Sequence, residues 1–158
     1  MIIVCDCSPL VALALCDQLT LLDALFNNVI IPENVYAEAT IAGKPEAVKI
    51  AAYAQGKVVR AANPLPAQLQ GNVLGKGETE AIALYWEKSA DYLLVDEDKG
   101  RRFAKTNGIT IIGSLGILLL AKEKSLITSV RPFIHILRAS NIRIAEFLYQ
   151  SILRLAKE

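Results

Sequence analysis

The chain opens with a short β-branched run that ends in an aspartate. Residues 2–4 (Ile-Ile-Val) are typical of a strand that is buried on both faces and is therefore central in a parallel sheet. An apolar segment with helical spacing follows Pro9, so we expect Ser8 to cap this helix and Pro9 to be its first residue. Asp6 then lies at the carboxyl end of a central strand, where ligands bind in open α/β sheets. A carboxylate in that position is costly unless a cation compensates its charge.

The composition is that of a well-packed globular protein. Of the 158 residues, 53% are apolar and 21% are charged, which predicts one domain over residues 1–158, with C-terminal helices from about residue 125 to 158. The net charge of +1 creates no global field for nucleic acid, so any such binding needs a local patch or a metal ion. The longest apolar run, residues 115–121, is too short to cross a membrane. Three cysteines without a secretion signal predict reduced thiols and a cytoplasmic location.

Strand-like and helix-like segments alternate along the chain at short spacing, which predicts a parallel α/β sheet. The predicted strands are residues 2–4, 29–31, 58–60, 92–95 and 110–112, and residues 63–75 are predicted to form a surface loop. The predicted helices are residues 10–16, 19–25, 33–40, 45–55, 77–88, 98–107, 114–124, 130–139 and 145–157. In the last helix one packed face is expected, formed by Phe147, Leu148, Ile152 and Leu155.

Two of the predicted strands end in the same way, each in an aspartate. Because the ends of parallel strands meet at one edge of a sheet, Asp6 and Asp96 can converge there. Glu38 and Glu80 lie on predicted helices that can lean over that edge. Several carboxylates in one cleft repel each other unless a cation lies between them, and oxygen ligands select Mg²⁺ or Mn²⁺. An ion held in this way suits hydrolysis of a phosphodiester bond.

Each of these acids also has a simpler interpretation. Asp6 or Asp96 could cap the helix that follows it, and Glu38 could be a solvated surface residue. Glu78 and Glu80 are two residues apart and point about 200° apart around a helix, so they cannot share one face. One of the two is expected to complement the dipole of its helix.

Several segments together resemble the PIN domain family, and within it a small prokaryotic branch of unknown function. These segments are residues 6–10 (Asp-Cys-Ser-Pro-Leu), 31–38 (Ile-Pro-Glu-Asn-Val-Tyr-Ala-Glu), 75–82 (Gly-Lys-Gly-Glu-Thr-Glu-Ala-Ile), 93–104 (Leu-Leu-Val-Asp-Glu-Asp-Lys-Gly-Arg-Arg-Phe-Ala) and 112–116 (Ile-Gly-Ser-Leu-Gly). The family's acids fall on Asp6, Glu38 and Asp96. The third motif carries Glu80 or Glu78, and Glu80, followed by Ala-Ile-Ala, matches the Asp-Ala of the wider family better.

The resemblance implies a three-layer α/β/α sandwich with a central, mostly parallel sheet of about five short strands. It also implies a Mg²⁺- or Mn²⁺-dependent ribonuclease, with the metal held by Asp6, Glu38, Glu80 and Asp96. Many relatives are toxins of toxin–antitoxin pairs, act as homodimers and are bound by a small antitoxin protein. Three further residues are candidates for a supporting role: Ser8, Glu78 and Asp98. Cys7, between Asp6 and Ser8, is expected to point away from the site.

A group of cations follows Asp96 and is a candidate RNA-binding surface. The group comprises Lys99, Arg101, Arg102 and Lys105, and Lys76 is a similar candidate in the third motif. Such side chains can hold the RNA backbone beside the metal, because phosphate contacts position a substrate without reading its sequence. The simpler interpretation is a solvated helix face, for which Asp98 is the expected N-cap.

Two other functions fit parts of the pattern. The chain could be a catalytically weak or inactive PIN-fold module that binds RNA or protein, since the third acid departs from the wider family. A receiver-like signalling domain also has an aspartate at a strand end. It would need a lysine on a late strand and paired acids on its first loop, and neither is evident.

Overall fold

The computed structural model describes residues 1–63, 65 and 74–158, and within them the chain is built around a sheet of five strands. The strands are β1 (Ile2–Cys5), β2 (Asn28–Pro32), β3 (Val58–Val59), β4 (Tyr92–Leu94) and β5 (Ile111–Ile112). Their order is β3-β2-β1-β4-β5, and every neighbouring pair is parallel. The opening run is thus the central strand, as the sequence predicts. The predicted loop at residues 63–75 lies largely outside the described residues.

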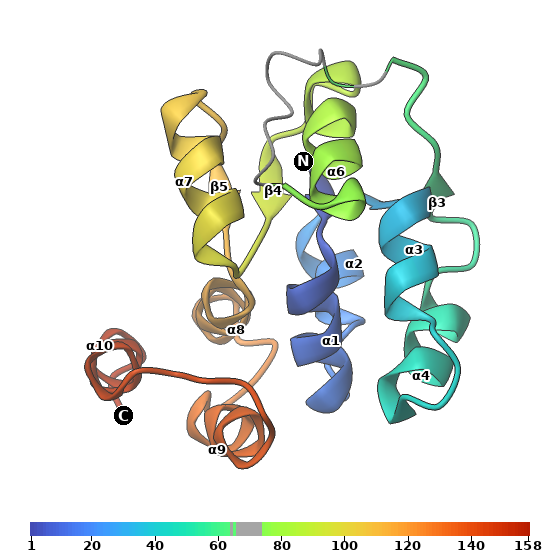
Figure 1. Ribbon diagram of the computed structural model, residues 1–158. Helices are drawn as coiled ribbons and strands as arrows, with labels where there is room; N and C mark the ends of the chain where they lie inside the picture. The colour runs from blue at the N-terminus through green and yellow to red at the C-terminus, as the bar shows by residue number, and fades with distance from the viewer. Residues whose placement is uncertain (64, 66–73) are drawn as a thin grey trace.

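Helices cover both faces of the sheet, which confirms the three-layer α/β/α arrangement (Figure 1). The helices near the first half of the sheet are α1 (Cys7–Leu15), α2 (Leu21–Leu25), α3 (Glu33–Ala39) and α4 (Pro45–Tyr53). The later helices are α6 (Lys76–Glu87), α7 (Asp98–Thr106), α8 (Ser114–Glu123), α9 (Arg131–Ala139) and α10 (Glu146–Leu155). No described helix is both long enough and apolar enough to cross a membrane.

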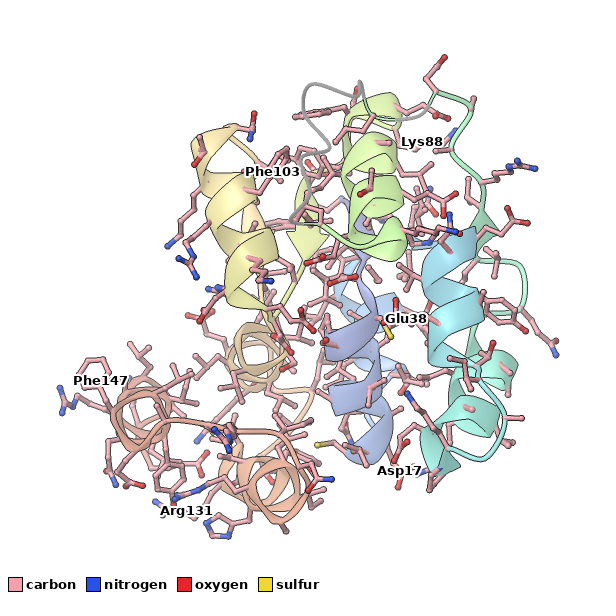
Figure 2. The ribbon with its side chains drawn as sticks, in the orientation of Figure 1. Asp17, Glu38, Lys88, Phe103, Arg131 and Phe147 are labelled. Carbon is pink, nitrogen blue, oxygen red and sulfur yellow. The ribbon has the colours of Figure 1, made fainter. Side chains whose placement is uncertain are left out.

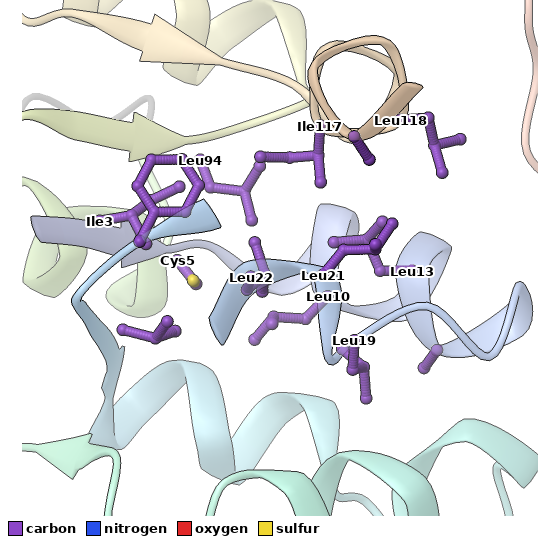
Figure 3. Close-up of a cluster of buried hydrophobic side chains, with 14 of the residues drawn as sticks. Ile3, Cys5, Leu10, Leu13, Leu19, Leu21, Leu22, Leu94, Ile117 and Leu118 are labelled. Atoms are coloured by element: carbon purple, nitrogen blue, oxygen red, sulfur yellow. The ribbon is translucent and has the colours of Figure 1, made fainter. Parts of the chain in front are cut away.

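Alternate residues of the central strands send their side chains into two separate cores. Ile3 and Cys5 of β1 pack with Leu94 of β4 against helices α1, α2 and α8 (Figure 3). Val4 and Leu93 point the other way, into the core formed with α6 and α7. The register pairs Val4 with Leu93 and Cys5 with Leu94, so residues that are paired across β1 and β4 lie on the same face.

Helix α1 begins earlier than the sequence predicts. Its first residue is Cys7, and Asp6 is an extended N-cap residue whose side chain makes no capping hydrogen bond. The expected roles of Ser8 and Pro9 as cap and first helical residue are therefore wrong. Pro9 still lies in the first turn, where a missing N–H removes no helical hydrogen bond. Cys7 packs against the core formed with α1, α2 and α8, and the charges of Glu38 and Asp6 contribute to the raised pKa of its thiol.

Helix α10 packs with a different face from the expected one. Its buried residues are Tyr149, Ile152 and Leu153, followed by Ala156. Phe147 and Leu155 are 84% and 70% exposed, and Figure 2 shows Phe147 at the outer edge of the molecule. Apolar residues occur nearly all around this helix, so its spacing alone does not select the packed side. Tyr149 belongs to the apolar core, and its hydroxyl lies 3.2 Å from Nε2 of His135 on α9.

Candidate active site

Asp6 is the most buried of the candidate acids. It follows β1 directly, its backbone N–H donates to the Leu94 carbonyl oxygen at 2.9 Å, and the residue is only 4% exposed. Burial is the main reason why the pKa of Asp6 is raised to about 7. A hydrogen bond from the backbone of Cys7 lowers this pKa, and the nearby carboxylates of Glu78, Glu97 and Glu38 raise it. Asp6 therefore lies where negative charge accumulates and where a cation would be stabilised.

Glu38 approaches Asp6 from helix α3, on the side of that helix that faces α1 (Figure 2). Burial, followed by the charges of Glu38 and Asp6, raises the pKa of the Cys7 thiol at the start of α1 to about 12. On its other side Glu38 meets Gly77 of α6, where an added Cβ would lie 3.2 Å from Oε2. The close approach of α3 and α6 thus depends on a residue without a side chain.

Glu78 presents a carboxylate oxygen to the same place from helix α6. Its Oε2 accepts the N–H of Gly75, the N-cap residue of α6, at 2.9 Å. Its Oε1 is buried and has no hydrogen-bond partner among the described residues. A Cβ on Gly100 would lie 3.0 Å from this oxygen, so glycine at that position leaves room for it. Asp6 and Glu78 line the same small cavity, which makes Glu78 the α6 acid that faces Asp6.

Glu80, the sequence-preferred third acid, has other partners. It is 8% exposed, and its Oε2 accepts the backbone N–H and the side-chain Nδ2–H of Asn34 at 2.7 and 2.8 Å. Its Oε1 accepts the N–H of Ala61 at 3.1 Å. Glu80 also borders a different cavity, of about 700 Å³, which Arg60 and Lys76 line with it. The structure does not bring Glu80 together with Asp6.

Asp96 lies beside the first turn of α8 and not against Asp6. Its Oδ1 accepts the backbone N–H of Ser114 at 2.8 Å, and the Ser114 side chain also hydrogen-bonds with it. Burial raises the pKa of Asp96, while Ser114 and the nearby Arg101 guanidinium lower it. Arg101 donates from Nη1 to the Val95 carbonyl oxygen at 3.1 Å. Asp96 therefore caps a helix, as the simpler interpretation allowed, but the helix is α8 and not α7.

Glu97 is an acid of this site that sequence reasoning missed. Its charge raises the pKa of both Asp6 and Asp96, and its Oε1 accepts the Ser8 hydroxyl at 2.8 Å. The pairing of Cys5 with Leu94 sets the ends of β1 and β4 side by side, and Glu97 lies in the turn after β4 as the N-cap residue of α7. Three consecutive acids, residues 96–98, were the available signal, but the sequence alone does not say which one approaches Asp6.

The supporting candidates are distributed around this group. Ser8 binds Glu97, as described above, and Asp98 is the exposed first residue of α7. Lys99, Arg102 and Lys105 are exposed on α7, three residues apart, so they form one face of that helix. None of the ion pairs found in the described part of the chain involves these three cations. Lys76, the first residue of α6, is also exposed.

The side chains around Asp6 are of the chemical type that binds a hard divalent cation, but their positions in this structure do not form a complete binding site. Across residues 1–63, 65 and 74–158, no three His, Cys, Asp or Glu side chains are arranged to hold a metal ion as they stand. The charged side chains around Asp6 are carboxylates, whose oxygens Mg²⁺ and Mn²⁺ prefer as ligands. Oε1 of Glu78, buried and without a hydrogen-bond partner among the described residues, is available as a ligand.

A comparison with protein families gives one relevant finding. A family model described as a PIN domain matches residues 2–158, a range that includes every candidate acid. Comparisons with curated proteins and with solved structures give no significant match.

Proposed function

Because the chain belongs to the PIN domain family, we propose that it is a Mg²⁺- or Mn²⁺-dependent endoribonuclease that hydrolyses phosphodiester bonds of RNA. The observation that carries this proposal is the surroundings of Asp6, whose buried carboxyl group faces three other carboxylates. Such a group is stable only if a proton is bound or a cation enters. Glu78 is a second argument for a bound cation, because one of its carboxylate oxygens is buried and has no hydrogen-bond partner among the described residues.

In this proposal Asp6, Glu38, Glu78 and Glu97 hold the metal. When bound, the ion lowers the pKa of water at the site and neutralises charge on the phosphate oxygens. Ser8 orients Glu97 through its hydroxyl. Asp96, which the sequence ranks among the ligands, has a supporting role here. It holds the first turn of α8 beside the site.

RNA is proposed to reach the acids along helix α7. The exposed cations Lys99, Arg102 and Lys105 can each contact a backbone phosphate. Lys76, exposed at the start of α6, is a further candidate for such a contact. Arg101 is half-buried beside Asp96 and is better placed to neutralise that carboxylate than to reach RNA. Since the net charge of the chain is only +1, this local face supplies the attraction that the whole molecule lacks.

The cellular role that we propose follows the family. The protein acts in the cytoplasm as the toxin of a toxin–antitoxin pair, as a homodimer, and is neutralised by a small antitoxin protein. Induced expression in a bacterial host should arrest growth, and Asp6→Asn should relieve the arrest. Light scattering of the purified chain tests the dimer. Growth that continues at normal protein levels would argue against the toxin role.

The direct test is cleavage of a defined RNA in the presence of Mn²⁺. Wild-type protein should cut it, EDTA should stop cleavage, and Asp6→Asn should lower the rate by at least about 100-fold, because it removes the carboxylate at the centre of the group. Undiminished cleavage by Asp6→Asn would overturn the mechanism.

The alternative is a non-catalytic PIN-fold module that binds RNA or protein. It is favoured by the finding that no three acids within the described part of the chain form a ready metal site. Calorimetric titration with Mn²⁺ separates the two functions, because a module with an inactive site should show no specific uptake of the ion.

A further inference from the structure

Glu80 joins helix α6 to the beginning of helix α3. Asn34 is the second residue of α3, so its backbone N–H has no partner within its own helix. Glu80 accepts that N–H and the Asn34 side-chain N–H with one oxygen, and accepts the N–H of Ala61 with the other. All three partners are donors, so only the ionised carboxylate satisfies them all. Its negative charge also lies at the positive end of the α3 dipole.

A second contact between the same helices lies one turn away on each. Gly77 is three residues before Glu80 on α6, and Glu38 is four residues after Asn34 on α3. At this second contact an added Cβ on Gly77 would lie 3.2 Å from Oε2 of Glu38. Residues four apart share a helix face, so Asn34 and Glu38 face α6 together. Helix α3 therefore approaches α6 at two levels: hydrogen bonds hold it at Glu80, and the missing side chain of Gly77 allows the close approach at Glu38.

Glu78 lies between these two levels on α6 and faces Asp6. Any sliding of α3 along α6 would change the separation of Glu38 and Glu78. The hydrogen bonds between Glu80 and Asn34 oppose such sliding, because the donors would lose a buried acceptor.

We propose that Glu80 is a positioning residue that sets the spacing of Glu38 and Glu78 through Asn34, and so determines the metal affinity of the site. The inference rests on the proposed function, since it takes Glu38 and Glu78 to be metal ligands. It assigns the two glutamates of the third motif to different tasks: Glu78 binds the ion, and Glu80 holds α3.

The test is calorimetric titration of the full chain with Mn²⁺, using two variants. Glu80→Gln keeps the shape of the side chain but turns an amide donor toward one of the three donors. It should weaken Mn²⁺ binding about 10-fold, as expected for a residue that orients a ligand. Asn34→Ala removes only the side-chain bond and should weaken binding by a smaller factor in the same direction. Because both act through one contact, the double variant should bind no more weakly than Glu80→Gln alone.

A second readout does not depend on metal. Hydrogen–deuterium exchange of the α3 amides should become faster in both variants, because the first turn of that helix loses its anchor. At saturating Mn²⁺, the kcat of RNA cleavage by Glu80→Gln should return to within about twofold of wild type, since positioning residues act through ligand geometry. A direct ligand such as Glu78 would not be rescued in this way.

Glu87→Gln is the matched control. Glu87 is on the same helix and accepts the neighbouring loop amides of Ala62 and Asn63, at 2.8 and 3.5 Å, but makes none of the hydrogen bonds to α3 found among the described residues. Its replacement should leave Mn²⁺ affinity and the exchange of α3 unchanged.

The outcomes separate the inference from the function on which it rests. If wild-type protein takes up Mn²⁺ and both Glu80→Gln and Asn34→Ala bind it equally well, the positioning role is wrong and the proposed function stands. A kcat that stays low for Glu80→Gln at saturating Mn²⁺ also overturns it. If wild-type protein takes up no Mn²⁺, the proposed function fails and the positioning role fails with it. Should Glu80→Gln not fold, Asn34→Ala decides alone.

Discussion

At the scale of single residues, the Asp6 carboxyl group lies in surroundings that disfavour its charge. Burial and three neighbouring carboxylates raise its pKa to about 7. A raised pKa means that the folded protein holds the proton more tightly than the unfolded chain does. The stabilising effect is complete below the ordinary pKa of aspartate and is lost as the pH rises through about 7. The metal-free site is therefore least stable in the pH range where a nuclease works.

Asp6→Asn should stabilise the metal-free protein while it abolishes cleavage. Above pH 7 the variant no longer buries a charge, so its free energy of unfolding should exceed that of wild type by on the order of 4 kcal/mol. The difference should shrink as the pH falls toward 4, because Asp6 is then protonated in the folded protein and increasingly protonated in the unfolded chain. Thermal unfolding in EDTA between pH 4 and 8 measures it. Glu123→Gln, an exposed acid on α8, is the control and should show no such trend. Equal stabilities at pH 8 would contradict the prediction.

Glu97 and Asp96 are adjacent in the chain but should respond differently to loss of charge. Glu97→Gln should weaken Mn²⁺ binding about 10-fold or more with little change in Tm, because the residue is exposed and faces Asp6. Asp96→Ala should lower stability by about 1–3 kcal/mol, because it removes the buried acceptor that caps α8. Calorimetry with Mn²⁺ and thermal unfolding of both variants decide this. The reverse ranking in metal affinity would return the ligand role to Asp96.

At the scale of secondary-structure elements, one residue joins the three C-terminal helices. Glu158 has a side chain that is 11% exposed. Burial by itself raises its pKa, but hydrogen bonds to the carboxylate outweigh this and lower the pKa to about 2. The donors are Lys122 Nζ at 2.6 Å, Ser129 Oγ at 2.6 Å, and the N–H groups of Val130 at 2.7 Å and Arg131 at 3.2 Å. The end of α8, the start of α9 and the residues after α10 are thereby held together.

Glu158→Gln should destabilise the protein by about 1–2 kcal/mol at pH 7, since donors would lose a charged acceptor. A lowered pKa contributes stability above the ordinary value near 4.5, and this stability is lost as the pH falls toward about 2. The difference from wild type should therefore be smaller in acid, which urea unfolding at pH 3 and pH 7 can show. Glu146→Gln removes a surface ion pair with Arg138 and should leave stability almost unchanged at both pH values. A Glu158→Gln effect that is equal at both pH values would contradict this account.

Helix α7 offers a test of how RNA is bound. Replacing Lys99, Arg102 and Lys105 together by alanine should reduce the slope of log affinity against log salt by about 2, because each phosphate contact on a single strand contributes about 0.7. Binding to Asp6→Asn, which does not cut the RNA, is measured by fluorescence anisotropy at several salt concentrations. Lys124→Ala, an exposed cation just after α8, should leave the slope unchanged. An unchanged slope in the triple variant would place the RNA elsewhere.

At the scale of the whole molecule, the proposed binding of a metal ion would be coupled to folding. The candidate ligands come from the end of β1, from α3, from α6 and from the segment between β4 and α7. These segments are brought together only in the folded chain, so an ion that binds them favours the folded state by mass action. The repulsion among the carboxylates is relieved by the same ion.

Mn²⁺ should therefore raise the Tm of the wild-type protein in a concentration-dependent way. At 100 times the dissociation constant the gain in the free energy of unfolding is about 2.7 kcal/mol. Differential scanning fluorimetry with Mn²⁺, and again after addition of EDTA, measures it. Asp6→Asn should show a much smaller shift, and Ca²⁺ serves as the comparison ion. Absence of any shift in wild-type protein at millimolar Mn²⁺ would argue for the non-catalytic module.

The sequence by itself determined the elements and the edge of the sheet where the acids lie. Five apolar runs and their intervening amphipathic segments predict the strands and helices, because hydrophobic periodicity is a local property. The sequence also placed Asp6 at the end of the central strand. A β-branched run that is buried on both faces and ends in a charged residue is typical of a central strand in a parallel sheet. The family resemblance rests on the same local motifs, and the family match over residues 2–158 confirms it.

Only the tertiary structure decided which of the neighbouring acids meet. The register between β1 and β4 sets the ends of these strands side by side, and the turn that follows β4 places Glu97 near Asp6 and Asp96 against Ser114 of α8. The packing of α3 on α6 likewise separates Glu78 from Glu80. Register and helix packing depend on contacts between residues far apart in the chain, so no local pattern contains them.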